Sequence, residues 1–106
     1  MFKVCVIGLG YVGLPILINL SKKFNPTGYD INEQRIKDLK RGIDIFNEFK
    51  KTVLKSKKII FTNSINSIKK SNLYIITVPT PINIKKLPDL KHLKDVCNNL
   101  SKIIKK

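Results

Sequence analysis

Apolar residues occur in two arrangements that alternate along this chain. Nearly continuous apolar runs at 2–8, 58–62 and 73–78, and a shorter one that ends at Asp30, are typical of strands in a parallel sheet. The segments between them favour helices, most clearly from Asp89 onward, where apolar residues recur three and four apart. The expected helices are residues 11–23, 31–42, 48–58, 64–71 and from 89 to the end.

Two prolines and a glycine, residue types that interrupt helices and strands, stand at positions compatible with the expected boundaries of these elements. Pro15 fits a helix only in its first turn, where the missing N–H costs no hydrogen bond. Gly42 stands where the polar helix should end, and Pro26 is tolerable as the first residue of the second strand. We therefore expect strands and helices to follow one another without an internal repeat or a linker.

This order of elements predicts the fold class. Strands that alternate with helices form a parallel sheet with right-handed crossovers. We expect an α/β fold that is the first half only of a Rossmann-type doubly wound sheet, with strand order 3-2-1-4. Because the chain stops where a fifth strand would begin, we expect residues 1–106 to be a truncated domain. Its fourth strand would be an exposed edge, open to a homo-oligomer or to a missing remainder.

Length and composition narrow the class of protein. A chain of 106 residues with 42% hydrophobic and 26% charged residues suits one globular domain. Its apolar runs are too short for a membrane span, and no signal-peptide pattern opens the chain, so we expect a cytoplasmic location. Cys5 and Cys97 lie in apolar surroundings of the pattern and are expected to be free, buried thiols. No spacing typical of metal ligands is present.

The net charge of +14 raises the possibility of a nucleic-acid partner. The basic residues are nearly all lysines spread over the whole chain, and only Arg35 and Arg41 carry the guanidinium fork that base recognition favours. We attribute the charge mainly to compositional bias on solvated faces. Nucleic-acid binding is the less favoured alternative.

The segment GLGYVG, Gly8 to Gly13, follows the first expected strand and opens the first helix. In that context Gly8 would allow a tight turn, Gly10 would let the backbone approach a pyrophosphate, and Gly13 would let the helix pack closely on the strand. The N–H groups and positive dipole end of the helix would face the phosphates. A turn of the same shape that binds nothing is the alternative, and the glycines alone do not decide between them.

An acidic residue shifts this balance towards NAD. Asp30 ends the second strand, where a carboxylate can accept hydrogen bonds from the adenosine ribose and would repel the 2′-phosphate of NADP. Arg35, one helical turn further on, is expected to contact the cofactor, although a solvated helix charge is the alternative. The TVPTP segment, 77–81, should end the fourth strand beside the nicotinamide, or else be an ordinary strand exit.

In the order of its motifs, the chain resembles the N-terminal NAD-binding domain of the UDP-glucose/GDP-mannose dehydrogenase family. The resemblance rests on KVCVIGLGYVGLP, GYDINEQRIKDLKRGID and LYIITVPTPI, and its wording is nearest the bacterial UDP-N-acetylhexosamine 6-dehydrogenases of surface polysaccharide synthesis. It implies a pyrophosphate site, a ribose site and a nicotinamide site. Their residues would be, in that order, Gly8, Gly10, Tyr11, Val12 and Gly13; Asp30 and Arg35; and Val78, Thr80 and Pro81.

The same resemblance implies what the chain would not do alone. Family members oxidise the C6 hydroxyl of a nucleotide sugar to a carboxylate with NAD, through a thioester on a cysteine. Neither Cys5 nor Cys97 matches that position, so we expect no catalytic residue here and an inactive fragment. Two other classes remain open: a nucleotide-sensing regulatory module, which would not need TVPTP, and a basic polyanion binder, which would not respond to NAD.

Overall fold

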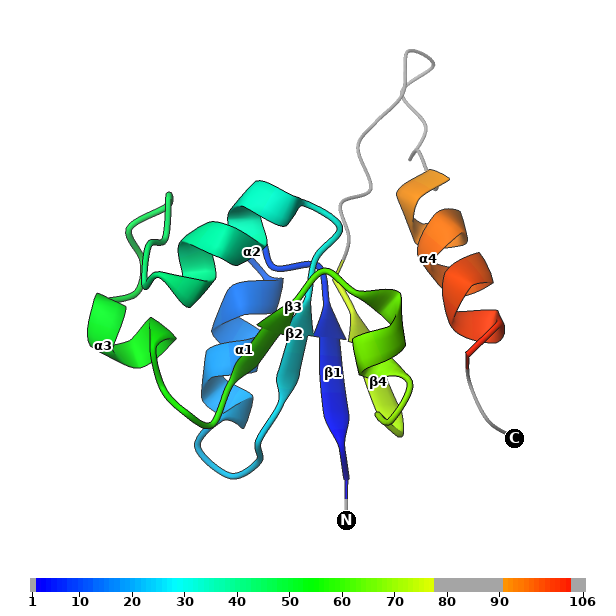
Figure 1. The fold of residues 1–106 in the computed structure, drawn as a ribbon, viewed down its shortest axis with the longest axis horizontal. Helices are drawn as coiled ribbons and strands as arrows, with labels where there is room; N and C mark the ends of the chain where they lie inside the picture. The colour runs from blue at the N-terminus through cyan, green and yellow to red at the C-terminus, as the bar shows by residue number, and fades with distance from the viewer. Residues whose placement is uncertain (1, 78–90, 104–106) are drawn as a thin grey trace.

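A four-stranded sheet in the order β3-β2-β1-β4 organises the chain, as Figure 1 shows. The computed structural model describes residues 2–77 and 91–103. Its elements follow one another along the chain as β1 Val4–Ile7, α1 Gly13–Leu20, β2 Thr27–Tyr29, α2 Glu33–Lys40, α3 Lys51–Leu54, β3 Ile60–Thr62, the 3-10 helix η1 Ile65–Ile68, β4 Leu73–Ile76 and α4 Lys91–Ser101.

All strand pairs in the sheet are parallel, and β1 lies in the middle. Its Cys5 pairs with Thr27 of β2 on one side and with Tyr74 of β4 on the other, while β2 pairs with β3. All four residues of β1 are buried, which explains its unbroken apolar run. The predicted α/β class and the strand order 3-2-1-4 are thus confirmed.

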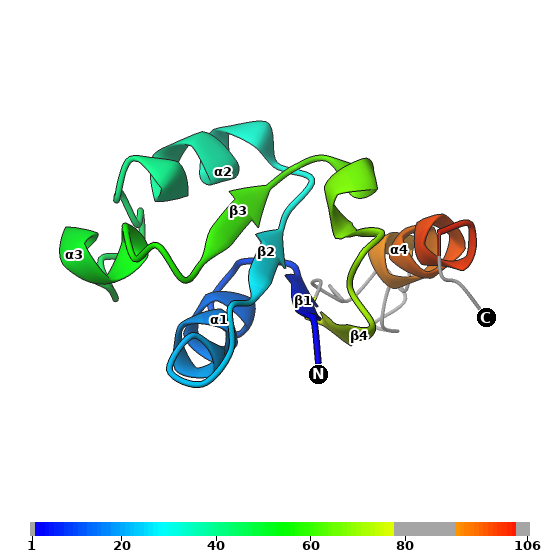
Figure 2. The same ribbon diagram turned by 60° about the horizontal axis from the view of Figure 1, so that its bottom comes forward.

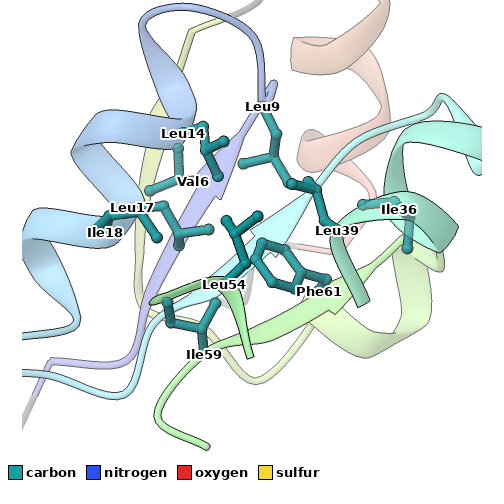
Figure 3. Packing of buried hydrophobic residues seen from close by; sticks show 10 residues of the cluster. All are labelled: Val6, Leu9, Leu14, Leu17, Ile18, Ile36, Leu39, Leu54, Ile59 and Phe61. Carbon is teal, nitrogen blue, oxygen red and sulfur yellow. The ribbon is translucent and has the colours of Figure 1, made fainter. Parts of the chain in front are cut away.

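Helices cover both faces of the sheet, as Figure 2 shows, and a hydrophobic core lies on each face. The larger joins α1, α2 and α3 to the sheet, and Figure 3 shows its side chains interdigitating. Its members are Val6, Leu9, Leu14, Leu17, Ile18, Ile36, Leu39, Leu54, Ile59 and Phe61. The smaller core joins β1 to η1 and α4. Helices on both faces are what a doubly wound sheet requires.

Local signals set the helix boundaries much as expected. Pro15 lies in the first turn of α1, and the Asn32 side chain caps α2 by accepting a hydrogen bond from the Arg35 N–H at 3.1 Å. Gly42 follows α2 with φ of 80°, a conformation that favours glycine. The elements are shorter than the patterns that predicted them. The helix expected over 48–58 covers Lys51–Leu54, and the one expected over 64–71 is the 3-10 helix Ile65–Ile68.

One expectation about the cysteines is wrong. Both thiols are free, and Cys5 is buried in β1, but Cys97 is exposed on α4. On that helix Leu100 is buried and Val96 packs against the smaller core, so the contact stripe is narrower than the apolar pattern suggested.

The larger core predicts a sharp loss of stability on truncation of Leu17. This side chain is fully buried between α1 and the sheet, so Leu17→Ala should lower the free energy of unfolding by about 2–5 kcal/mol. Asn19→Ala, at an exposed position of the same helix, should change it by no more than about 0.5 kcal/mol. Urea titrations followed by circular dichroism compare the two, and equal midpoints would contradict this packing.

Candidate functional site

The turn between β1 and α1 is built on its first and last glycines. Gly8 has φ of 95°, and its N–H donates to the Tyr29 carbonyl of β2 at 2.8 Å. A Cβ on Gly13 would overlap the Gly8 carbonyl and the Thr77 hydroxyl. The roles predicted for these two glycines, a tight turn and close helix–strand packing, therefore match the geometry.

The middle glycine faces open space. A Cβ on Gly10 would meet no atom within 4 Å, and its φ is outside the left-handed region. The fold therefore does not require glycine at this position, whereas a ligand that approaches the backbone would. The N-cap of α1 is Val12, which has no side-chain acceptor for the N–H groups at the helix end.

Asp30 is held rigidly beside this turn. Its Oδ2 accepts a hydrogen bond from the Leu9 N–H, and its Oδ1 accepts one from the Asn32 N–H, both at 2.9 Å. The first bond ties the end of β2 to the glycine turn, and the second starts the turn into α2. Each carboxylate oxygen retains acceptor capacity, and the residue is only half-buried, so vicinal hydroxyls can reach it.

A cavity of about 680 Å³ opens over the carboxyl ends of the strands. Of the predicted residues Gly8, Gly10, Tyr11, Val12 and Asp30 line it. The rest of its described wall comes from Ile7, Leu9, Tyr29, Ile31, Phe46, Ile65, Thr77, Asp95, Val96, Asn99 and Leu100. The strand order reverses at β1, because β2 and β3 lie on one side of it and β4 lies on the other. The cavity lies at this switch point, the position at which open α/β sheets bind ligands.

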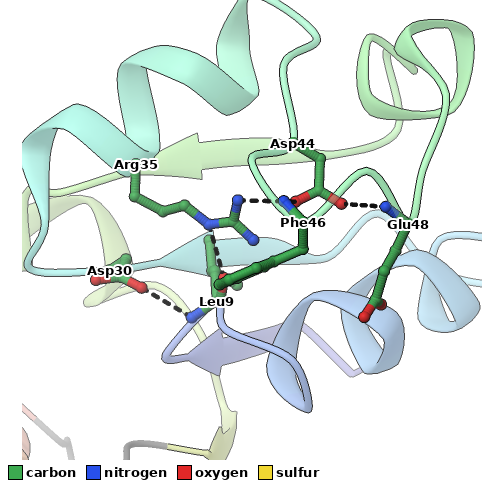
Figure 4. A network of polar contacts seen from close by, with 6 residues as sticks. All are labelled: Leu9, Asp30, Arg35, Asp44, Phe46 and Glu48. Carbon is green, nitrogen blue, oxygen red and sulfur yellow. Dashed lines mark hydrogen bonds and ion pairs between the residues drawn. The ribbon is translucent and has the colours of Figure 1, made fainter.

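Arg35 is not a solvated helix charge. Only 6% of it is exposed, its Nε donates to the Leu9 carbonyl at 2.9 Å, and its Nη1 donates to Asp44 at 3.0 Å (Figure 4). It does not belong to the described wall of the cavity. A direct contact of Arg35 with the ribose therefore stays a prediction. The hydrogen bonds that the structure shows for this side chain tie the glycine turn, through the Leu9 carbonyl, to Asp44.

Asp44 is the buried partner of this arginine. Burial of its carboxyl acts to raise the pKa, but hydrogen bonds from Arg35 and from the Phe46 and Glu48 amides outweigh that effect and hold the pKa below its ordinary value. The pair is thus a charged one at neutral pH, with 1% of the Asp44 side chain exposed.

The fourth strand joins the site through Thr77. The Thr77 hydroxyl donates to the Gly8 carbonyl at 2.6 Å, and its N–H donates to the Ile7 carbonyl at 2.8 Å. The first residue of TVPTP thereby closes the gap between β4 and the glycine turn. The predicted nicotinamide-side residues Val78, Thr80 and Pro81 lie outside the described residues.

Sequence reasoning did not identify Asp44, Phe46 or the α4 side of the cavity. Phe46 and Asn99 line the cavity, but the sequence around each of them indicates secondary structure at most and contains no binding motif. The amphipathic stripe of α4 signalled that one side meets the sheet. Nothing in 43–50 signalled a site.

Two classes of feature are absent from the described part of the chain. Residues 2–77 and 91–103 contain no group of three or more His, Cys, Asp or Glu side chains that could hold a metal ion. In the same ranges, no helix has both the length and the apolar character needed to cross a bilayer.

Together, the open glycine turn, the anchored carboxylate and the cavity define a dinucleotide-binding domain of the Rossmann class. The chain belongs to the UDP-glucose/GDP-mannose dehydrogenase family, whose NAD binding domain it matches over residues 2–106. This confirms the resemblance noted from the motifs.

Relatives and solved structures agree with this assignment. A UDP-N-acetyl-D-glucosamine 6-dehydrogenase from Pseudomonas aeruginosa is 43% identical over 98% of this chain and 25% of its own length. One from Salmonella typhi is 47% identical over 86% of this chain and 22% of its own length. The structure of a UDP-D-ManNAc dehydrogenase from Pyrococcus horikoshii superposes with a TM-score of 0.87 at 31% identity, over 96% of this chain and 26% of that one. The chain thus spans about a quarter of the length of these proteins.

NAD is the cofactor of this domain, and the residues present fit it. Space above Gly10 admits a pyrophosphate, and the fixed Asp30 carboxylate offers acceptors for ribose hydroxyls. Apolar side chains such as Ile31 and Ile65 give the cavity surfaces suited to a flat ring.

Substitution of Gly10 and of Gly13 by alanine should change the free energy of unfolding by different amounts, because only Gly13 is closely packed. Gly13→Ala places a Cβ against the Gly8 carbonyl and should destabilise the fold by about 1–3 kcal/mol or more. Gly10→Ala meets nothing and should shift stability by no more than about 0.5 kcal/mol. Urea titration of both variants tests this, and equal losses would show that the turn is packed differently.

The Asp44 carboxylate should make stability fall in acid. Its folded pKa lies below the unfolded value of about 3.9, so its contribution is complete above that pH and is lost as the pH falls through the folded pKa. Asp44→Asn should be less stable than wild type at pH 7, and the difference should narrow below about pH 4. Unfolding free energies at pH 7 and pH 3 measure it; a constant difference would refute the charged pair.

Proposed function

We propose that this chain is the NAD-holding part of a nucleotide-sugar 6-dehydrogenase, which oxidises the C6 alcohol of a UDP-N-acetylhexosamine to a uronate for surface polysaccharide synthesis. The observation that carries the proposal is the anchored Asp30 carboxylate at one wall of a cavity that also contains the open glycine turn. The names of the relatives, UDP-N-acetylhexosamine dehydrogenases at 43% and 47% identity, support the choice of sugar.

In this proposal each part of the cavity holds one part of NAD. The turn residues Gly8 to Gly13 bind the pyrophosphate through backbone N–H groups, as the open space at Gly10 and the free helix end allow. Asp30 accepts hydrogen bonds from the adenosine ribose. Val78, Thr80 and Pro81 border the nicotinamide, which is supported by the position of Thr77 in the wall of the same cavity.

In this proposal the described residues bind and orient the cofactor, and neither Cys5 nor Cys97 acts as the nucleophile. When bound, NAD supplies the hydride acceptor for the oxidation. Cys5 and Cys97 are both outside the described cavity wall, and burial raises the pKa of the Cys5 thiol to about 12, so it is not a thiolate at neutral pH. We therefore place the nucleotide-sugar site and its reactive groups outside these 106 residues.

The edge strand β4 is the proposed route to partners. It lies at the end of the sheet, and Leu73 on it is 42% exposed. Further strands from the rest of a dehydrogenase, or from a second copy of this chain, would cover that edge.

We place the activity in the cytoplasm, a location supported by the two free thiols.

Two alternatives receive less support. A nucleotide-sensing regulatory module would use the same turn and carboxylate, but it would have no need for the Thr77 contact that joins TVPTP to the glycines. A polyanion binder would bind with a steep salt dependence and without a response to NAD, and it would leave the cavity, whose described wall contains no lysine, without a role.

Replacement of Gly10 should separate NAD binding from folding. Gly10→Val fills the open space over the turn and should weaken NAD binding at least about tenfold, while the urea midpoint stays near that of wild type. Isothermal titration calorimetry with NAD and NADP gives the affinities, and wild type should prefer NAD because Asp30 repels the additional phosphate. Unchanged NAD affinity in folded Gly10→Val would refute the assigned site.

A further inference from the structure

The segment that follows α2 is wound around a single carboxylate. Asp44 Oδ1 accepts a hydrogen bond from the Phe46 N–H at 3.1 Å, and Oδ2 accepts one from the Glu48 N–H at 3.0 Å. The Asp44 carbonyl accepts a third from Asn47, which has φ of 53°. These bonds fix residues 44–48 without regular secondary structure.

Arg35 connects this loop to the glycine turn. Its Nη1 bonds to Asp44 and its Nε bonds to the Leu9 carbonyl, one residue before Gly10. Both charged side chains are buried, so neither exchanges its partner for water at low cost. The loop and the turn are therefore held at a fixed separation (Figure 4).

The side chain presented by this arrangement is Phe46. Its ring stacks on Tyr11 with 4.0 Å between ring centroids and 28° between planes, and its other neighbour is the Arg35 guanidinium, 5.0 Å from the centroid. Among the described residues Arg35 Nη2 has no hydrogen-bond partner, and the Phe46 ring gives the guanidinium a cation–π contact in addition to its ion pair with Asp44. Both rings line the cavity, and Tyr11 is 66% exposed.

We propose that Phe46 is a positioning residue for the dinucleotide, an inference that rests on the proposed NAD site. Tyr11 directly follows Gly10, so an unrestrained Tyr11 ring can swing over the space where the pyrophosphate would lie. The stack with Phe46 holds that ring in one place before the cofactor arrives, which removes an ordering cost from binding. Asp44 and Arg35 act through Phe46, because they fix the loop that presents it.

A double-mutant cycle in NAD affinity tests this role. Calorimetry on the 106-residue chain should show about three- to tenfold weaker NAD binding in Phe46→Ala, and near wild-type binding in Phe46→Tyr, which keeps the ring. Phe46→Leu keeps the apolar volume without the stack and should resemble Phe46→Ala. The matched control is Ile45→Ala, because Ile45 is 62% exposed in the same loop and is not part of the described cavity wall.

Coupling between the two rings is the decisive readout. If Phe46 acts through Tyr11, the Tyr11→Ala/Phe46→Ala pair should bind NAD no more than about twofold worse than Tyr11→Ala alone. Losses that multiply, or folded Phe46→Ala and Phe46→Leu variants that bind as wild type does, would overturn the inference. Failure of the wild-type chain to bind NAD would overturn the proposed function, and the inference with it. The urea midpoint of each variant shows whether weak binding is caused by misfolding.

Discussion

The close approach of α1 to the end of β1 is the contact on which the rest of the structure depends. Gly13 allows it, because any side chain there would overlap the Gly8 carbonyl. The same carbonyl accepts a hydrogen bond from Thr77, so the central strand, the first helix and the edge strand meet at one backbone group. This approach lets Leu14 and Leu17 fill the larger core and directs the helix end towards the cavity.

A buried ion pair provides the second constraint, and its value lies in position more than in stability. The Coulomb attraction between Arg35 and Asp44 is offset by the loss of water around both groups, so replacing the two together by apolar residues would change stability little, whereas removing one partner leaves the other charge buried and unpaired. Its bonds reach the Leu9 carbonyl and the amides of the following loop. An apolar replacement could fill the same volume, but it would not fix the loop against the turn.

Most of the sheet could be predicted from the sequence, and the support of the site could not. β1 is buried throughout, so its apolar run was unambiguous, and Asp30 follows β2 at a position that the parallel topology fixes. The loop around Asp44 has no period, because side-chain-to-backbone hydrogen bonds organise it. Arg35 is buried against the same loop, so its burial could not be predicted from the sequence either. Cys97 was misplaced because a stripe of apolar residues does not show how much of it a partner covers.

The distribution of charge around the cavity bears on which dinucleotide it suits. The chain carries a net charge of +14, but the charged residues in the described cavity wall are Asp30 and Asp95, both acidic. Phosphates at the turn would therefore meet backbone N–H groups and a helix dipole in place of lysines. The N–H groups of such a turn are well matched to the two phosphates of the pyrophosphate. The 2′-phosphate of NADP, a third phosphate beside Asp30, would face a fixed carboxylate without a cationic neighbour on the described wall. The described wall of the cavity therefore offers the 2′-phosphate of NADP no lysine or arginine as a partner.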